Sequence, residues 1–193
     1  MNTFVLDTSP AKSAEYHCDK HVVKMILESG QMLCAAHWMH LLKLYYPGDI
    51  SEFKRVRDIQ SWLRSNTPEA IQPPWSLSHM RHPCTIWTGE TYENYMWQYK
   101  LGISLCKEYT KRYGKVHASE IVIMWLGNNL PVNIDRKKGL TPFVICMKEE
   151  YKISKDPVKC YRNYYLKDKI RFAKRKLNNE PYWWKKGVEN GKT

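Results

Sequence analysis

The stretch Tyr16-His-Cys-Asp-Lys-His-Val-Val-Lys-Met-Ile-Leu-Glu28 places a line of polar side chains on a helix that is otherwise largely apolar. At about 100° per residue, this polar stripe consists of His17, His21, Lys24 and Glu28, with Lys20 beside it. Apolar residues flank the stripe on both sides, whereas a solvated face would have polar neighbours. Titratable groups are seldom buried without partners. We therefore expect the stripe to line a functional site or to belong to an internal ion-pair network.

The rest of the chain predicts further helices and almost no strand. Ser9 and Pro10 are typical of a helix start, so the first helix is expected from Pro10 to about Tyr45, with Gly30 as the site of any bend. Apolar spacing predicts four more helices, at residues 51–64, 90–113, 119–126 and 157–177, and the proline-rich residues 65–83 form a long loop. The predicted fold class is mainly α: one compact domain of about five helices over residues 1–186, with long connecting loops and a disordered tail at 187–193.

The charge of the chain indicates a polyanionic partner. Its 31 Lys and Arg exceed its 19 Asp and Glu, for a formal net charge of +12. From Lys155 onward there are twelve Lys and Arg against four Asp and Glu, an excess of eight positive charges. Eight Trp and thirteen Tyr suit base stacking between basic groups as well as packing. We expect DNA or a nucleotide-derived ligand as the partner, with an aromatic core under a solvated basic surface as the alternative.

The cysteines and the apolar runs bear on location. Six cysteines without a CxxC pair, and no secretory signal at the amino end, favour reduced thiols in a cytoplasmic protein, in the host cytoplasm if the protein is viral. The apolar runs are too short to span a bilayer, so no membrane partner is expected.

Metal binding by the stripe is a second interpretation. His17 and His21 have the spacing of two ligands on one helix face, but Cys18 stands where the zinc-protease signature has Glu. Lys20 and Lys24 add positive charge beside the pair. We therefore expect no metal ion and no other cofactor.

The polar stripe is suited to acid and base chemistry on a nucleic acid, with His17, His21 and Glu28 as candidate catalytic residues. A larger set is expected to hold phosphate or nucleic acid: Lys20, Lys24, His82, Arg112, Lys115, His117, Arg162, Tyr165 and Lys169. Those outside the first helix are predicted to converge on the stripe as the other walls of one pocket. For Arg112, Lys115 and His117 the structural alternative is helix capping, because a helix C-terminus favours cations.

Short motifs occur through most of the chain: Ser9-Pro10 with Ala14, His17-Cys-Asp-Lys-His21, His82-Pro83, Asn94-Tyr95 with Trp97, Glu108-Tyr109 to Lys115 with His117, Thr141-Pro-Phe143, and Tyr161-Arg-Asn-Tyr-Tyr165 with Lys169. In this combination the chain resembles a family of small proteins encoded by bacteriophages and large DNA viruses. That resemblance implies a viral protein and carries no activity with it.

The layout of the chain is similar to that of the pyrimidine-dimer DNA glycosylases. Both have a short amino-terminal arm, a polar first helix, a later helix ending in a Glu-to-Arg-Gly run, and an aromatic, basic C-terminal segment. In that family the α-amine of a Thr exposed by removal of Met attacks the sugar C1′ and forms a Schiff base, and a catalytic Glu lies on the first helix. Here the second residue is Asn2, before which Met is not normally removed. Glu15 and Glu28 are the first-helix candidates for the acid.

The leading hypothesis is a viral nucleic-acid-acting enzyme, a DNA glycosylase or other base-processing hydrolase centred on the polar stripe. Base flipping needs stacking aromatic rings, phosphate contacts and an acid/base group, and the sequence has candidates for each. One alternative is a non-catalytic viral binder that sequesters a nucleotide signal or a host factor. A further alternative is a metal-dependent nuclease.

Overall fold

A computed structural model describes residues 1–177 and 180–190, and within them the chain has eight α-helices and no β-strand. The helices are α1 (Pro10–Tyr16), α2 (Asp19–Tyr45), α3 (Val56–Asn66), α4 (Pro83–Thr88), α5 (Tyr92–Tyr113), α6 (Glu120–Asn128), α7 (Pro157–Tyr164) and α8 (Tyr182–Asn190). Single 3-10 turns lie at Ile50–Glu52, Glu69–Ile71 and Glu149–Tyr151, and a π-helical turn follows α7 at Tyr165–Lys169. The mainly α class predicted from the sequence is confirmed, with more and shorter helices than the expected five.

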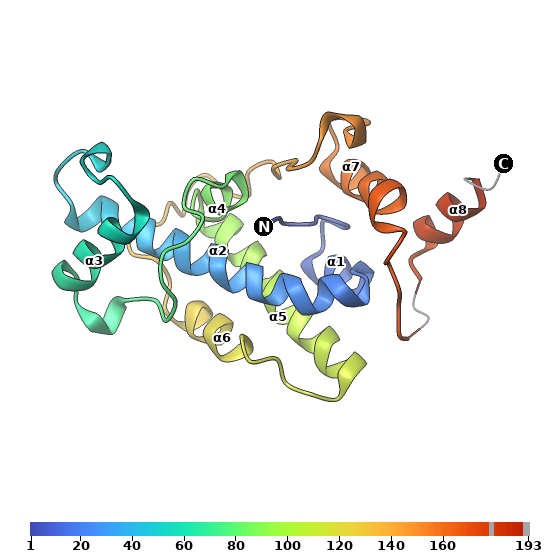
Figure 1. The fold of residues 1–193 in the computed structure, drawn as a ribbon, viewed down its shortest axis with the longest axis horizontal. Coiled ribbons are helices and arrows are strands. Elements are labelled where there is room, and N and C mark those ends of the chain that lie inside the picture. Colours follow the sequence, from blue (N-terminus) through green and yellow to red (C-terminus); the bar gives the residue numbers. More distant parts are fainter. Residues whose placement is uncertain (178–179, 191–193) are drawn as a thin grey trace.

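The long helices α2 and α5 pack against each other and form the centre of the fold (Figure 1). Helix α1 packs on α5, α6 packs on both long helices, and α4 packs on α2. Helix α3 lies at the far end of α2, where a second apolar cluster forms around Trp38, Leu41 and Leu63. In the part of the chain that the structure describes, no helix has the length and apolarity needed to cross a bilayer.

The expected first helix is in fact two helices, which corrects the sequence prediction. His17 and Cys18 have extended backbones, with ψ of 137° and 162°, so α1 ends at Tyr16 and α2 begins at Asp19. The carbonyl groups that end α1 accept hydrogen bonds from Arg112 and Arg175, which replace the helical bonds lost at the break. Local spacing does not reveal the break, because both arginines come from distant parts of the chain.

Two glycines have packing roles that the sequence does not show. Gly30 lies inside α2, and a Cβ at this position would come within 2.5 Å of the Trp75 ring, so glycine admits the ring. The helix predicted at residues 119–126 should stop at Gly127, but α6 continues through this glycine to Asn128. A Cβ there would lie 2.3 Å from the Tyr99 ring.

Two of the other helix ends lie where their capping residues predict, and two do not. Gly114 has φ of 67° and ends α5 as predicted, and the Asp156 side chain accepts hydrogen bonds from the first amides of α7. Helix α3 starts five residues later than expected, because Asp49 caps a separate 3-10 turn. Helix α8 continues to Asn190, past the boundary expected at residue 187, while residues 191–193 lie outside the described part.

Candidate functional site

The amino-terminal arm, residues 1–6, runs across α2 between α4 and α7 (Figure 1). Its residues 3–6 are buried, and the Thr3 hydroxyl is 3.0 Å from Gln98 Oε1 of α5. The Leu6 amide donates to Ser13, and the Leu6 carbonyl accepts from Arg162 at 2.8 Å. These contacts hold the arm in place and bring Met1 to the middle of α2.

Glu28 is the residue that the arm reaches. The Met1 amino nitrogen lies 3.6 Å from Glu28 Oε1, and the Asn2 amide donates to Glu28 Oε2 at 2.9 Å. Lys24, one turn earlier on α2, places its Nζ 3.2 Å from the same carboxylate. The Glu28 side chain is only 9% exposed, whereas the Lys24 side chain is 65% exposed. An amine and a carboxylate are thus held together beside an exposed lysine.

The Asn2 side chain ties the arm to two more segments. Its Nδ2 donates to the Cys146 carbonyl at 2.7 Å, and its Oδ1 accepts from the Tyr161 hydroxyl of α7 at 2.8 Å. The Cys84 thiol of α4 lies 3.8 Å from the same Oδ1. The start of the chain is therefore enclosed by α2, α4, α7 and the segment around residue 146.

A group of three side chains lies beside the arm: His82, Cys84 and Cys146. One ligand-type atom from each falls within 4.8 Å of the other two. The Cys84 thiol shares its proton with Cys146, which lowers the pKa of Cys146 to about 7 and raises the pKa of Cys84. Burial lowers the pKa of His82, and the positive charge of the Met1 amine lowers it further.

His17 and His21 of the polar stripe are buried in aromatic surroundings. The His21 ring stacks on Phe4 at 4.5 Å and its Nδ1 is hydrogen bonded to the Tyr165 hydroxyl, while His17 Nδ1 is 2.6 Å from the Ser13 carbonyl. Burial lowers the pKa of each to about 3, helped by nearby cations, so both rings are neutral at pH 7. The other ring nitrogen of His17, Nε2, is buried without a hydrogen-bond partner.

The stripe also has an exposed edge that its sequence does not predict. Val23 and Leu27 are 39% and 43% exposed, and Lys20 lies on the surface with its amine over the Phe172 ring. The stripe therefore passes from the core at His17 to the surface at Lys24.

Arg112 is buried, and its hydrogen-bond partners are groups that join two parts of the fold. Its guanidinium donates to Glu108 at 2.8 Å, to Asp19 at 3.1 Å and to the carbonyl groups at the end of α1. Its side chain has no exposed surface. The arginine thus joins α5 to the break between α1 and α2, and all three nitrogens of its guanidinium already donate hydrogen bonds within the protein.

The remaining predicted contact residues lie at separate places. Lys115 is exposed after the end of α5, and His117 accepts from the Ser119 amide at 3.1 Å. Arg162 binds the Leu6 carbonyl and Asp7, and Lys169 pairs with Asp168 at 2.7 Å. Of the predicted site residues, Glu28, Lys24 and His82 meet at the start of the arm, and Arg162 contacts its other end at Leu6, whereas Arg112 and His117 do not join them.

Sequence reasoning missed the Met1 amine, Asn2 and the two cysteines. Asn2 and Cys146 are 144 positions apart, so no spacing rule connects them. The short His82-x-Cys84 pair was the one local signal of ligand-type residues, and its partner Cys146 is visible only in the fold.

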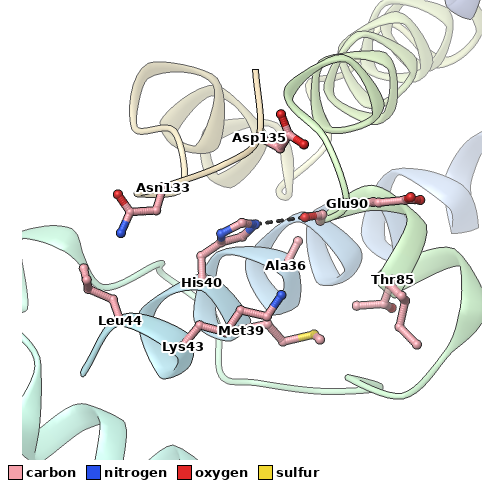
Figure 2. Close-up of a pocket in the computed structure, with 11 residues that line it drawn as sticks. Ala36, Met39, His40, Lys43, Leu44, Thr85, Glu90, Asn133 and Asp135 are labelled. Atoms are coloured by element: carbon pink, nitrogen blue, oxygen red, sulfur yellow. Dashed lines mark hydrogen bonds between the residues drawn. The ribbon is translucent and has the colours of Figure 1, made fainter. Parts of the chain in front are cut away.

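A separate cavity of about 350 Å³ lies where α2 meets α4 and the turn at residues 133–135. Figure 2 shows His40 at its centre, with a 2.9 Å hydrogen bond to the Gly89 carbonyl. Asp135 accepts from backbone amides, and Glu90 is paired with Lys138. Because His40, Glu90 and Asp135 are engaged within the protein, we assign no function to this cavity.

Comparison of the chain with protein-family models, with curated proteins and with solved structures found no match.

Proposed function

We propose that the protein is a DNA base-processing enzyme of the glycosylase and lyase type, with the α-amine of Met1 as nucleophile and Glu28 as acid/base. The observation that supports this proposal is the 3.6 Å contact between the Met1 amino nitrogen and Glu28 Oε1. An amine can attack a sugar carbon and form a Schiff base, and a carboxylate beside it can take up the proton that the amine must lose. The proposal requires a mature chain with a free amine at Met1.

The chemistry assigns one task to each group. The neutral amine attacks C1′ of the target nucleotide as the bond from C1′ to the base breaks, and the base leaves with the electron pair and takes a proton from water. The Glu28 carboxylate then removes a proton from the Met1 nitrogen, which is now bonded to C1′. Glu28 then returns that proton to O4′ as the sugar ring opens, which leaves a C1′=N iminium.

The surface around the arm supports a polyanionic substrate. Lys20 and Lys24 are exposed on α2, and the charge of Lys169 reaches the same region, because it acts on the pKa of His21. The Met1 amine and Lys24 both lie at Glu28, so a phosphate that flanks a target nucleotide would meet positive charge there.

Borohydride trapping tests the proposal. Duplexes that carry an abasic site, a pyrimidine dimer, uracil or a hydroxymethylated base are incubated with the protein and borohydride, which reduces an imine to a stable amine. We expect a covalent protein–DNA adduct with at least one of these duplexes, mapped to Met1 by peptide mass spectrometry. Glu28→Gln should lower the trapping rate by about 10²-fold or more, because general acid/base groups contribute effects of this size.

Glu15→Gln is the matched control, because Glu15 is the other carboxylate of the first-helix region and is exposed. Its trapping rate should equal that of the wild type. A second variant with Gly-Ser added before Met1 moves the amine away from Glu28 and should abolish trapping. An adduct mapped to a lysine, or no adduct with any duplex from a protein whose intact mass shows a free Met1, would refute the proposal.

A further inference from the structure

Three side chains beside the arm form a donor set that the proposed chemistry does not use. His82 and Cys84 lie at the start of α4, and Cys146 lies in the extended segment before the 3-10 turn at Glu149–Tyr151. Their ligand-type atoms all fall within 4.8 Å of one another. Ligands around a tetrahedral zinc ion, with bonds of about 2.0–2.3 Å, are about 3.3–3.8 Å apart, so side-chain rotations suffice to close the set.

We propose that His82, Cys84 and Cys146 bind one Zn²⁺ ion. Two sulfur donors and one imidazole are the ligand types that zinc prefers over magnesium or calcium. The set is assembled by the fold from α4 and from a segment 62 residues later, so it differs from the HxxxH pair on the polar stripe. The Nδ1 atoms of His17 and His21 are engaged elsewhere in the core, at Ser13 and Tyr165.

The charges around this donor set favour an ion. Two thiolates with Zn²⁺ are neutral overall, which suits a site where Cys84 is 1% exposed. The Met1 amine and Lys24 both lie on Glu28, so positive charge exceeds negative charge beside the donor set, and two thiolate ligands offset part of it. The contact that competes with the ion is the long 3.2 Å hydrogen bond from the Cys84 amide to His82 Nδ1.

The fourth position of the ion faces the arm. Asn2 Oδ1 lies 3.8 Å from Cys84 Sγ, which is the spacing of two ligands on one tetrahedral ion. Either this oxygen or a water molecule completes the coordination. In both cases the ion links α4 to the segment around Cys146 at the place where Asn2 is held, and thereby orders the arm. This inference concerns metal uptake alone and stands apart from the proposed DNA chemistry.

The wild-type protein provides the first test. Fully reduced, metal-free protein is titrated with Zn²⁺, and with Co²⁺ for its thiolate absorption band. We expect about one equivalent to bind with tetrahedral sulfur-rich spectra. Cys146 is the one cysteine of the six that is not buried, so iodoacetamide should modify it first, and one equivalent of Zn²⁺ should slow that reaction at least about tenfold. Reduced protein that binds no ion, with unchanged Cys146 alkylation, overturns the proposal.

Variants supply the second test. Cys84→Ser, Cys146→Ser and His82→Ala should each weaken Zn²⁺ binding by more than about tenfold. The matched control is Cys160→Ser, because this buried thiol donates to the Ser154 carbonyl at 3.1 Å and lies outside the donor set. Equal loss in the control, or wild-type affinity in Cys146→Ser, also overturns the proposal.

Discussion

The two buried histidines of the polar stripe should make the fold sensitive to mild acid. Burial lowers the pKa of both His17 and His21 to about 3, whereas a histidine in an unfolded chain titrates near pH 6.5. Below pH 6.5 the unfolded chain therefore binds protons that the folded chain does not. The stabilising contribution is complete above pH 6.5 and is lost as the pH falls towards 3. For each histidine the loss is about 1.4 kcal/mol per pH unit, or roughly 2 kcal/mol at pH 5 relative to pH 8.

The variant His21→Gln isolates one of these contributions. Glutamine keeps a polar partner for Tyr165 but does not titrate. We expect the slope of unfolding free energy against pH, measured by urea denaturation between pH 5.5 and 4.5, to be smaller than in the wild type by about 1.4 kcal/mol per pH unit. The slope is compared because any constant destabilisation by the substitution cancels from it.

The control for this experiment is His79→Asn. The His79 side chain is exposed, and asparagine tolerates its positive φ of 48°. Its slope should match that of the wild type. A His21→Gln slope equal to the wild-type slope would refute the reasoning, because it would mean that the folded protein protonates His21 as readily as the unfolded chain does.

Two further predictions concern buried packing and charge. Arg112→Met should lower the free energy of unfolding by about 3–5 kcal/mol in urea denaturation, because two carboxylates and the carbonyl groups at the end of α1 lose their partner. The control is Lys111→Met at the exposed neighbouring position, which should lower it by less than about 1 kcal/mol. An equal cost for the two would contradict the buried-network interpretation. Gly30→Ala should destabilise by about 1–3 kcal/mol in thermal unfolding, since its Cβ meets Trp75 at 2.5 Å, and Trp75→Leu in the same chain should recover part of that loss. Stabilisation by Gly30→Ala alone would contradict this prediction, because it would show that the Trp75 ring can move away at no cost.

Local chemistry made much of the fold predictable. Pro10 stands at the first position of α1, Gly114 ends α5 and Asp156 caps α7, in each case because the residue fits a backbone requirement of its own neighbours. The break at His17 was not predictable in this way. Its carbonyl is satisfied by Arg112, 95 positions away, and helical periodicity continues through the break without a breaker residue.

The sequence by itself determined the mainly helical class, some of the helix ends and the basic, aromatic character of the chain, because these depend on neighbouring residues and on composition. It also singled out Glu28 as a polar residue on an apolar helix. Only the tertiary structure decided what Glu28 meets, since Met1 and Asn2 reach it from a segment that shares no periodicity with α2, and Asn2 is in turn held by Cys84 and Cys146. The same long-range packing placed His17 and His21 in the core, because side-chain burial depends on which distant rings cover a helix face.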